Sequence, residues 1–478
     1  MGIDQVIDRA MRPFADAIYD FVFYAVPLGG GVEMPLIVAW LIAGGLFFTL
    51  YLGFINVRGF KHSLALVSGR YSDPNHAGEV SHFQALATAV SGTVGIGNIG
   101  SVAVAVSVGG PGATFWMIIA GLLGMSTKFA ECTLAVKFRR EHDDGSVSGG
   151  PMYFLRRGLA LRGLPRTGKV LGVFYAAAMV VGCLGIGNMF QSNQAVAILI
   201  DVTGGSESFF ADRAWLLGLL MAMVVALVIV GGIKSIARTT SKLVPFMAAL
   251  YILMALTVLA LNLEKLPASF GYIWHGAFSP ESIGGGLIGT MIIGFRRAVF
   301  SNEAGLGSAA IAHSAVRTDE PVTEGFVALL EPFIDTVVIC TLTSLVIVTT
   351  VYDPALATSE VSGIELTAGA FASTLSWSPV PLSVAAVLFA FSTLISWSYY
   401  GLKAFTYLAG RRKAVEVGFR LFYCSFIVLG SSIQLGALID LSDALIYVVA
   451  IPNLMGLYLL APVLKEELLS YRERLARF

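Results

Sequence analysis

Long runs of apolar residues, each near the length that crosses a lipid bilayer, alternate with polar connections along the chain. A helix needs about 20 mostly apolar residues to span the hydrocarbon core, because each residue advances it by about 1.5 Å. Length and hydropathy indicate about eleven such runs. They lie near 36–56, 83–108, 112–136, 170–200, 214–233, 241–262, 284–315, 322–350, 380–409, 415–435 and 439–463. The pattern therefore predicts an all-α polytopic membrane protein.

The stretch before the first run has a different pattern. At 13–27, apolar side chains such as Phe21 lie on one face of a helix and acidic ones such as Asp20 on the other. This stretch is too short and too acidic to cross the bilayer, so we expect an amphipathic helix at the membrane interface. We assign 1–35 to this interfacial segment and 36–56 to an extra N-terminal transmembrane helix.

The second run, 83–108, has glycines and polar residues at its centre. Its residues Ser91–Gly100 read Ser-Gly-Thr-Val-Gly-Ile-Gly-Asn-Ile-Gly. Glycine inside a helix costs about 1 kcal/mol relative to alanine, and each backbone group without a partner in lipid costs several kcal/mol more. A break is stable here only where protein, water, an ion or a polar solute binds the freed groups. We therefore predict a discontinuous helix whose open backbone is a binding site.

This stretch has two other interpretations. Gly95–Gly100 matches the dinucleotide motif G-x-G-x-x-G, but that motif binds a nucleotide only between a strand and a helix, and the flanks here are apolar spans. Glycines also let transmembrane helices pack closely. Close packing explains some of the glycines, but it does not explain Ser91, Thr93 and Asn98.

Composition excludes a soluble protein. Of the 478 residues, 56% are hydrophobic and 13% are charged, and mean hydropathy is +0.78. Soluble domains average about 25% charged residues. The 31 basic and 31 acidic residues give zero net charge, which argues against nucleic acid as a partner. The four cysteines are far apart in apolar runs, so we expect neither disulfides nor zinc, and we expect no cofactor.

Lysine and arginine concentrate in every second connection. Most of them lie in 57–82, 137–169, 234–242, 410–414 and 464–478. The connections 352–379 and 436–443 contain neither residue. The positive-inside rule then predicts an integral plasma-membrane protein, in the inner membrane if the source is bacterial, with its N-terminus outside and its C-terminus in the cytoplasm.

The seventh run, 284–315, is a second interrupted span. Glycines divide it, and it contains Arg296, Arg297 and Glu303, which are costly at membrane depth and usually functional there. The second and seventh runs are five apart, so alternating topology makes them cross the membrane in opposite directions. Interrupted helices at matching positions of two inverted halves are the best sequence indication of a secondary-transporter site.

We therefore divide the remaining chain into two inverted five-helix repeats, 83–262 and 268–463, followed by a cytoplasmic tail at 464–478. Polar clusters at 185–194 and 391–400 fall in the third and eighth spans of this core. Hydrogen bonds between helices are the simpler explanation for either cluster alone. The four polar segments together favour a shared site.

Four motifs resemble those of the alanine or glycine:cation symporter family. They are Gly95–Asn98, Gly149–Tyr153, Gly187–Gln191 and Phe300–Ser308. The resemblance runs from about His82 to the last span, and Ser-Asn-Glu-Ala-Gly within the fourth motif is quite specific. It implies the leucine-transporter fold of five-plus-five inverted repeats and Na⁺-coupled transport of small neutral amino acids. One departure is Ala298, where the family pattern leads us to expect glycine.

The resemblance also implies roles for individual residues. Freed amides at the start of a half-helix carry partial positive charge and would face the substrate carboxylate. The implied substrate site comprises Thr93, Ile96, Gly97, Gly187, Gln191, Phe300, Asn302, Thr393 and Trp397. The implied Na⁺ ligands are oxygen atoms of Ser91, Thr93, Val94, Asn98, Ser301, Ser392 and Thr393. The bulky Phe300 and Trp397 leave little room for a substrate side chain, which favours alanine or glycine over leucine.

The other buried charges have simpler expected roles. Lys128 and Glu131, three residues apart on one helix, are expected to pair. Glu303 is expected to bind backbone freed near the second break, and Gly149–Pro151 to begin a surface helix. His313 is expected to be a packing or interface residue.

Glu331 and Asp335 are expected to share a helix face, either as a structural polar network or as a proton site. Coupling to H⁺ through one of these two carboxylates or Glu303 is therefore an alternative to Na⁺. An ion channel is less favoured, because the polar clusters pair within one chain. An enzyme is less favoured still, because we find no catalytic constellation at compatible depths.

Overall fold

Long apolar helices make up most of the protein. The computed structural model describes residues 12–13, 16–29, 32–71, 73, 75–279, 286–352, 363–432 and 436–475. Within these residues, seven helices are long and apolar enough to cross a membrane, and a bent pair of helices is an eighth candidate. Two shorter apolar helices, α2 (Leu36–Tyr51) and α11 (Ala214–Ile229), lie at two further predicted spans. The all-α polytopic class is confirmed, whereas the count of eleven spans stays a prediction.

Before α11, the long helices lie at the predicted runs, whereas the short helices α3 (Ile55–Arg58), α4 (Phe60–Val67) and α8 (Pro151–Leu161) lie largely in the predicted connections 57–82 and 137–169. The other helices after α2 are α5 (His82–Thr93), α6 (Val102–Gly109), α7 (Ala113–Lys137), α9 (Pro165–Leu184) and α10 (Phe190–Val202). Two π-helical stretches, η1 (Gly97–Ser101) and η2 (Gly185–Met189), lead into α6 and α10. A 3₁₀ turn, η3 (Gly205–Glu207), precedes α11.

The helices after α11 include the second interrupted span. They are α12 (Gly232–Leu261), α13 (Leu266–Phe278), α14 (Gly286–Asn302), α15 (Ser308–His313), α16 (Pro321–Ala328), α17 (Leu330–Pro332), α18 (Thr341–Thr350), α19 (Ile364–Ala372), α20 (Pro379–Ala409), α21 (Lys413–Ser432) and α22 (Gly436–Leu475). A 3₁₀ turn, η4 (Leu263–Lys265), precedes α13, and a π-helix, η5 (Phe333–Cys340), lies between α17 and α18.

The N-terminal segment differs from the prediction of one helix over 13–27. The chain is helical at 16–22 and then forms a strand, β1 (Ala25–Gly29), which pairs antiparallel with β2 (Val32–Pro35). Pro27 and Gly29 are poor helix formers, which explains the early end. The 16–22 helix covers Arg296 of α14, whose guanidinium lies 4.0 Å from the ring centre of Phe23 and donates to the Tyr19 hydroxyl at 2.9 Å.

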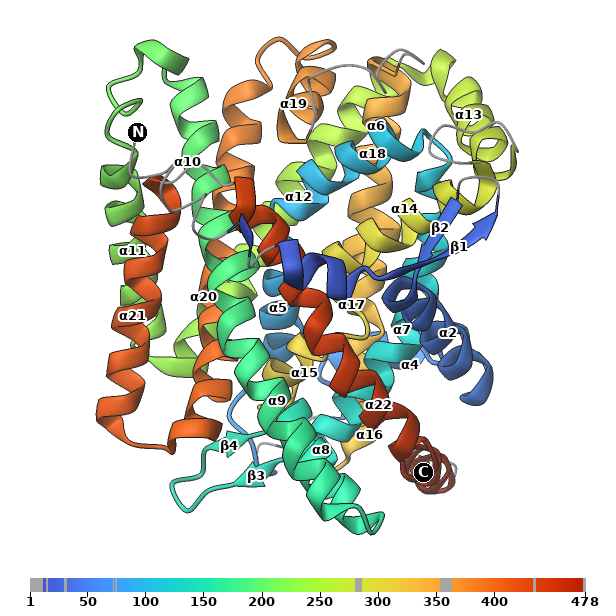
Figure 1. The fold of residues 1–478 in the computed structure, drawn as a ribbon, viewed down its shortest axis with the longest axis vertical. Coiled ribbons are helices and arrows are strands. Elements are labelled where there is room, and N and C mark those ends of the chain that lie inside the picture. Colours follow the sequence, from blue (N-terminus) through green and yellow to red (C-terminus); the bar gives the residue numbers. More distant parts are fainter. Residues whose placement is uncertain are drawn as a thin grey trace.

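Basic connections meet at one end of the bundle, the lower end in Figure 1. This end holds a hairpin of β3 (Arg140–Glu141) and β4 (Val147–Ser148), helix α8 and the link from α20 to α21. As predicted, Gly149–Pro151 begins a helix: Pro151 is the first residue of α8, and Gly150 has a φ of 108°. Which side of the membrane this end faces stays a prediction.

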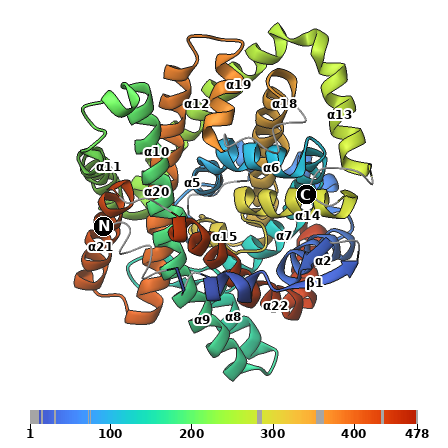
Figure 2. The ribbon, with the colours of Figure 1, turned by 45° about the horizontal axis from the view of Figure 1, so that its top comes forward.

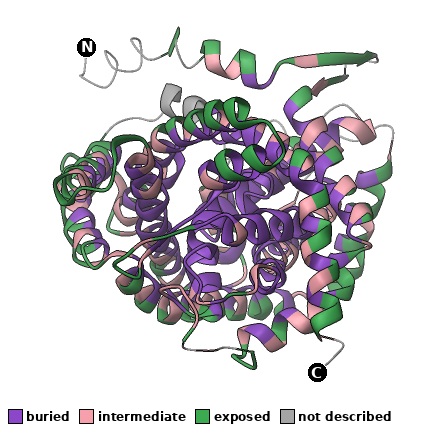
Figure 3. Cartoon of the chain, turned by 90° about the horizontal axis from the view of Figure 1, so that it is seen from below, coloured by how far each residue is buried: buried purple, intermediate pink, exposed green. Residues whose placement is uncertain are grey.

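Buried residues fill the centre of the bundle, and exposed residues lie on its outside (Figure 3). Many of the exposed side chains are large and apolar, such as Leu227 at 80% and Leu421 at 68% exposure. An apolar outer surface of this kind suits contact with lipid. The bent pair α5 and α6 lies near the middle, with α10, α11 and α21 on one side and α2 and α14 on the other (Figure 2).

The predicted break in the second span is present. Helix α5 begins with a capping box in which Ser81 Oγ accepts from the Gln84 N–H, and Gln84 Oε1 accepts from the Ser81 N–H. It ends where Val94 becomes extended, and the axis turns by 54° before the chain continues through η1 and α6. Asn98 Oδ1 accepts from the Gly95 N–H at 2.8 Å, which binds one backbone group freed by the break.

The second break follows α14. Glu303, Gly305 and Gly307 all have positive φ values, of 56°, 93° and 75°. Side chains from two other helices bind the freed backbone: Glu131 Oε1 accepts from the Gly307 N–H at 3.1 Å, and Asn453 Nδ2 donates to the Gly305 carbonyl at 2.8 Å. The expectation that Glu303 does this is wrong, because its carboxylate accepts from the Ser308 hydroxyl.

Candidate substrate and cation site

The broken helix is the meeting point of the predicted site. At the break, the Ile96 N–H donates to Gln191 Oε1 of α10 at 3.4 Å, and Trp397 Nε1 of α20 donates to the Gly92 carbonyl at 3.2 Å. All four residues are buried. The third and eighth core spans therefore reach the same point of the first core span, as the four polar segments predict.

Hydroxyl groups of α20 gather at the end of α5. Ser392 Oγ and Thr393 Oγ1 donate to the Ser91 carbonyl at 3.2 and 3.1 Å, and Ser91 Oγ donates to the Ser392 carbonyl at 3.0 Å. Ser396, which was not predicted, contacts the Ser91 hydroxyl and donates to the Thr88 carbonyl. These neutral oxygens are the ligand type that hard cations bind. Val94, the fourth predicted residue here, lies at the break itself.

A second polar cluster lies on the other side of the break and centres on Asp335 of η5. Its Oδ1 accepts from Asn98 Nδ2 at 2.6 Å. Its Oδ2 accepts from Ser301 Oγ of α14 at 2.8 Å and from Thr336 Oγ1 at 2.7 Å. The carboxylate is buried, and these three hydrogen-bond donors are neutral. A buried carboxylate surrounded by neutral donors is a favourable position for a cation.

Asp335 is not among the cation ligands expected from the sequence. The expectation for Glu331 and Asp335 is a shared helix face, as a structural polar network or a proton site, and the structure places the two carboxylates in separate hydrogen-bond clusters. Glu331 contacts Lys128 and His313, whereas Asp335 contacts Asn98. Asp335 lies in the π-helix η5, whereas Glu331 lies on α17 just before it, and the i→i+5 bonding of η5 changes the angular spacing of an α-helix. The sequence feature that could have indicated Asp335 is its position as an ionisable residue in an apolar span, where such residues are usually functional.

Two aromatic residues line the break closely. A Cβ atom on Gly187 would overlap the Trp397 indole, so only glycine fits there. A Cβ on Gly97 would lie 3.4 Å from Phe300 Cε1, so this ring packs over the unwound backbone. The Phe300 ring also meets Phe190 edge-on, with ring centres 6.1 Å apart. Little space is left for a substrate side chain.

Two predicted substrate contacts point elsewhere in this conformation. Asn302 Nδ2 donates to Thr336 Oγ1 at 2.9 Å, and its Oδ1 accepts from the Ala304 N–H at 2.9 Å. Thr93 Oγ1 donates to the Val90 carbonyl of its own helix at 3.3 Å. Asn302 thus caps the break after α14, and only the backbone of Thr93 adjoins the first break.

Two simpler expectations about buried charges are wrong. Lys128 Nζ donates to Glu331 Oε1 at 2.9 Å, across helices, and Glu131 binds Asn453 and the Gly307 N–H instead. His313 is not a simple packing residue, since its ring lies between two buried carboxylates. Sequence spacing along one helix does not reveal a better partner on another.

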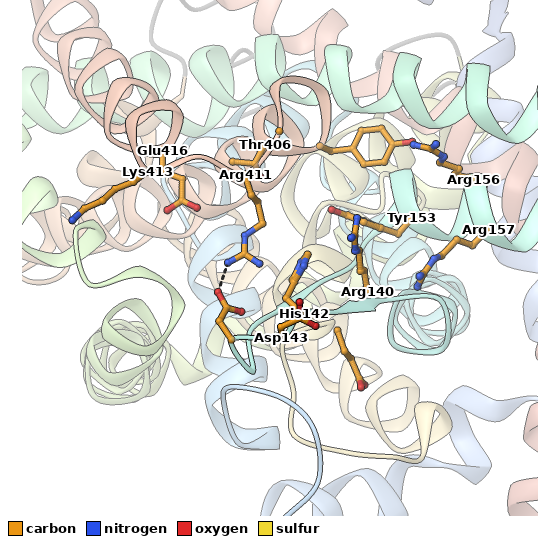
Figure 4. A pocket seen from close by; sticks show the side chains of 14 residues that line it. Arg140, His142, Asp143, Tyr153, Arg156, Arg157, Thr406, Arg411, Lys413 and Glu416 are labelled. Carbon is orange, nitrogen blue, oxygen red and sulfur yellow. Dashed lines mark hydrogen bonds and ion pairs between the residues drawn. The ribbon is translucent and has the colours of Figure 1, made fainter.

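A cavity of about 1000 Å³ lies at the basic end, away from the break (Figure 4). The β3–β4 hairpin, α8 and the link from α20 to α21 line it, and Arg411 crosses it to bind Asp144 at 2.7 Å. Hydrogen bonds from Ser146 and Arg411 hold the pKa of Asp144 well below its ordinary value. This ion pair therefore persists throughout the physiological pH range.

The sequence model of the sodium:alanine symporter family matches residues 26–477 of this chain. The chain belongs to this family. The sodium/alanine symporter AgcS of Methanococcus maripaludis is 40% identical over 458 residues, which are 95% of this chain and 98% of AgcS. The probable sodium/glutamine symporter GlnT of Bacillus subtilis is 33% identical over 439 residues, 91% of this chain and 87% of GlnT. The symporter family resemblance seen in the four motifs is thereby confirmed.

A solved structure shows the fold of this symporter. The crystal structure of MhsT in complex with L-phenylalanine matches it with a TM-score of 0.58, over 81% of this chain and 90% of MhsT. Sequence identity is 16%, so the likeness concerns the fold alone. It confirms the leucine-transporter fold with its five-plus-five inverted repeats. The exact boundaries 83–262 and 268–463 stay predictions.

Proposed function

We propose that this symporter imports alanine or glycine together with Na⁺, by alternating access to a site at the α5–α6 break. The observation that carries the proposal is the convergence of α10, α14, η5 and α20 on the freed backbone of one broken helix. A transporter needs such a site at mid-membrane depth, reachable from one side at a time. Family membership and the fold support the same conclusion.

One Na⁺ would bind between α5 and α20. Its ligands would be the carbonyls of Ser91 and Val94 and the hydroxyls of Ser392 and Thr393, and both hydroxyls now donate to the Ser91 carbonyl. All these oxygens are neutral. A monovalent ion held by neutral oxygens is bound weakly enough to be released during each cycle.

A second Na⁺ would bind beside Asp335. Its ligands would include the Thr93 carbonyl, Asn98 Oδ1, Ser301 Oγ and the Asp335 carboxylate. Burial of an ionised carboxylate without a compensating charge is costly. The bound cation would supply this charge, and Asn98, which bonds both Asp335 and the Gly95 amide, would link the cation to the shape of the break.

The amino acid would bind where the Ile96 and Gly97 amides emerge. Its carboxylate would take the place of Gln191 Oε1, the present partner of the Ile96 N–H, and Gln191 would turn to the substrate's other polar group. Phe300, Trp397 and Thr393 would enclose the side chain, with Gly187 allowing the indole to approach. Asn302 would contribute by holding the α14 break in place. A methyl group or hydrogen fits this space better than the longer glutamine chain.

The basic end, with β3, β4, α8 and the C-terminal helix, would face the cytoplasm and the N-terminus the outside. Substrate and Na⁺ would enter from the side of α13 and α19 and leave toward α8. The protein would reside in the plasma membrane, or the inner membrane of a bacterium.

Uptake into proteoliposomes with an inward Na⁺ gradient tests the substrate. We expect unlabelled alanine or glycine to abolish uptake of labelled alanine, and a matched concentration of leucine or glutamine to reduce it by less than one third. The Tyr71→Phe variant, which changes an exposed residue away from the break, is the matched control. Equal competition by leucine or glutamine would contradict the proposed size limit.

A further inference from the structure

A chain of buried ionisable side chains extends from the first residue of α5 to α7. His82 Nδ1 and His313 Nδ1 each lie 2.6 Å from one oxygen of Glu324 on α16. His313 Nε2 lies 3.6 Å from Glu331 Oε2, and Lys128 Nζ lies 2.9 Å from Glu331 Oε1. The side chains of all five residues are at most 3% exposed. None of them belongs to the proposed substrate or Na⁺ sites.

The geometry indicates where a proton binds in this chain. Because an ionised Glu324 can only accept hydrogen bonds, each imidazole must donate to it through Nδ1–H, and Nε2 of a neutral His313 then carries a lone pair. That lone pair faces the Glu331 carboxylate, and neither atom has a hydrogen-bond partner among the described residues. A proton on Nε2 turns this repulsion into an ion pair, and a shift of about half an ångström makes a hydrogen bond of ordinary length.

Charge balance favours the same proton. Lys128 compensates one of the two carboxylates, Glu324 and Glu331, which leaves one negative charge when both histidines are neutral. A net charge in a buried cluster is unfavourable, and one imidazolium removes it. With His313 protonated, the four charged groups are neutral as a set.

The elements packed around this chain carry other titratable or charged groups that interact with it electrostatically. Glu131 and Cys132 lie on α7, Arg139 follows α7, Glu303 lies in the α14 break, and Asp335 lies on η5. Three of these groups are carboxyl groups, and Arg139 is occupied by backbone carbonyls, including that of Val316 at 2.6 Å. Each of these carboxyl groups, when ionised, adds negative charge near the chain and favours a proton on His313.

We propose that His313 is a proton-binding site that latches α5 closed at the basic end of the symporter. His82 is the first residue of α5, the half-helix that ends at the break, and Glu324 holds it to α16. The proposal rests on the alternating-access function above, in which α5 moves away at this end to release substrate. With His313 protonated, Glu324 and Glu331 are held by one imidazolium and α5 stays docked.

Loss of the proton weakens the latch. The cluster then carries an uncompensated buried charge, and the His313 lone pair faces Glu331 directly. Opening of α5 admits water to Glu324 and relieves this cost. Low pH at the basic end therefore favours the closed conformation, and high pH favours opening of α5 and release of the substrate.

Cysteine accessibility tests the latch without any substrate. We would replace the four native cysteines with serine or alanine, introduce Ala89→Cys on the buried face of α5, and measure labelling by a hydrophilic maleimide in detergent. Because maleimide reacts with the thiolate at a rate that rises with pH, each rate is divided by that of an exposed cysteine, Glu473→Cys, in the same background. We expect this ratio to rise at least fivefold from pH 6 to pH 8.5.

Two variants identify the groups responsible. His313→Gln cannot take the proton, and His82→Ala loses the link to α5, so each should give the high ratio at both pH values. His142→Gln is the matched control, because His142 lies at the same end and its ring bonds the Ser148 hydroxyl rather than a carboxylate. It should keep the pH dependence of the parent. Monodisperse elution on size exclusion checks that each variant is folded.

A ratio that is equal at the two pH values in the parent protein would overturn the proposal, as would a parent-like pH dependence in His313→Gln. Alanine uptake by the same protein is measured separately. If uptake depends on Na⁺ but the ratio does not change with pH, the latch alone fails. If the ratio changes but no small amino acid is taken up, the proposed substrate alone fails.

Discussion

Replacing Asp335 with asparagine removes one negative charge beside the α5–α6 break and changes the local shape little. The carboxylate now accepts three hydrogen bonds, from Asn98 at 2.6 Å, Ser301 at 2.8 Å and Thr336 at 2.7 Å. Asparagine keeps an acceptor oxygen at one of the two carboxylate positions only, so its NH₂ group faces a hydrogen-bond donor at the other. The variant therefore weakens the cluster and removes the proposed anionic Na⁺ ligand.

The size of the effect follows from the contacts. A hydrogen bond or close contact to a charged group contributes about 1.5–3 kcal/mol, and each 1.4 kcal/mol corresponds to about a tenfold change in affinity. Loss of the charged ligand should therefore raise the Na⁺ concentration for half-maximal uptake by about 10- to 100-fold. The affinity for alanine at saturating Na⁺ should change much less.

The assay is uptake of labelled alanine into proteoliposomes over a series of external Na⁺ concentrations. Thr336→Val is the matched control, since it removes one donor to Asp335 and keeps the charge. It should raise the half-maximal Na⁺ concentration by about 2- to 10-fold, less than Asp335→Asn, because one neutral hydrogen bond contributes about 0.5–1.5 kcal/mol. An unchanged Na⁺ dependence in Asp335→Asn would refute the assignment of Asp335 to the cation site.

Three further predictions concern packing and charge. Gly187→Ala should abolish alanine uptake while the protein remains monodisperse, because the added Cβ would overlap the Trp397 indole. Normal uptake by this variant would mean that the indole does not line the site. Ser392→Ala should raise the half-maximal Na⁺ concentration by about 3- to 10-fold in the same uptake assay, through loss of one hydroxyl ligand, and an unchanged value would remove Ser392 from the ligand set. Lys128→Met should destabilise the protein by about 3–5 kcal/mol, because Glu331 is left buried without its lysine partner. Adding Glu331→Gln should restore most of the lost melting temperature in a thermal-shift assay. No recovery would show that loss of the Lys128–Glu331 pair is not the cause.

Local composition was enough to predict where the helices break. Glycines with Ser91, Thr93 and Asn98 in an apolar run indicate open backbone whatever surrounds it, and the spacing of two such runs by five spans indicates inverted repeats. The polar clusters on the third and eighth core spans were likewise visible. Their convergence on Ile96 and Gly92 followed from the fold that the resemblance implied.

Pairing across helices was not predictable in the same way. Lys128 has a carboxylate three residues away on its own helix, yet it bonds Glu331, because the choice of partner depends on how α7 packs on α17. Asp335 lies in a π-helix, which has no reliable signature in the sequence, and it bonds Asn98 rather than the partners of Glu331. The β1–β2 hairpin stands where the end of a helix was predicted. The local reason is Pro27 and Gly29, two poor helix formers that the prediction gave less weight than the amphipathic pattern.

The most direct test of the central claim is accumulation of labelled alanine in proteoliposomes, first with an inward Na⁺ gradient and then with K⁺ in its place, for the parent protein and Asn98→Ala. We predict accumulation that requires Na⁺ and is lost in the variant, because Asn98 joins the proposed cation ligand Asp335 to the broken backbone. Accumulation that is unchanged in K⁺ and driven instead by an inward pH gradient would contradict Na⁺ coupling at the break.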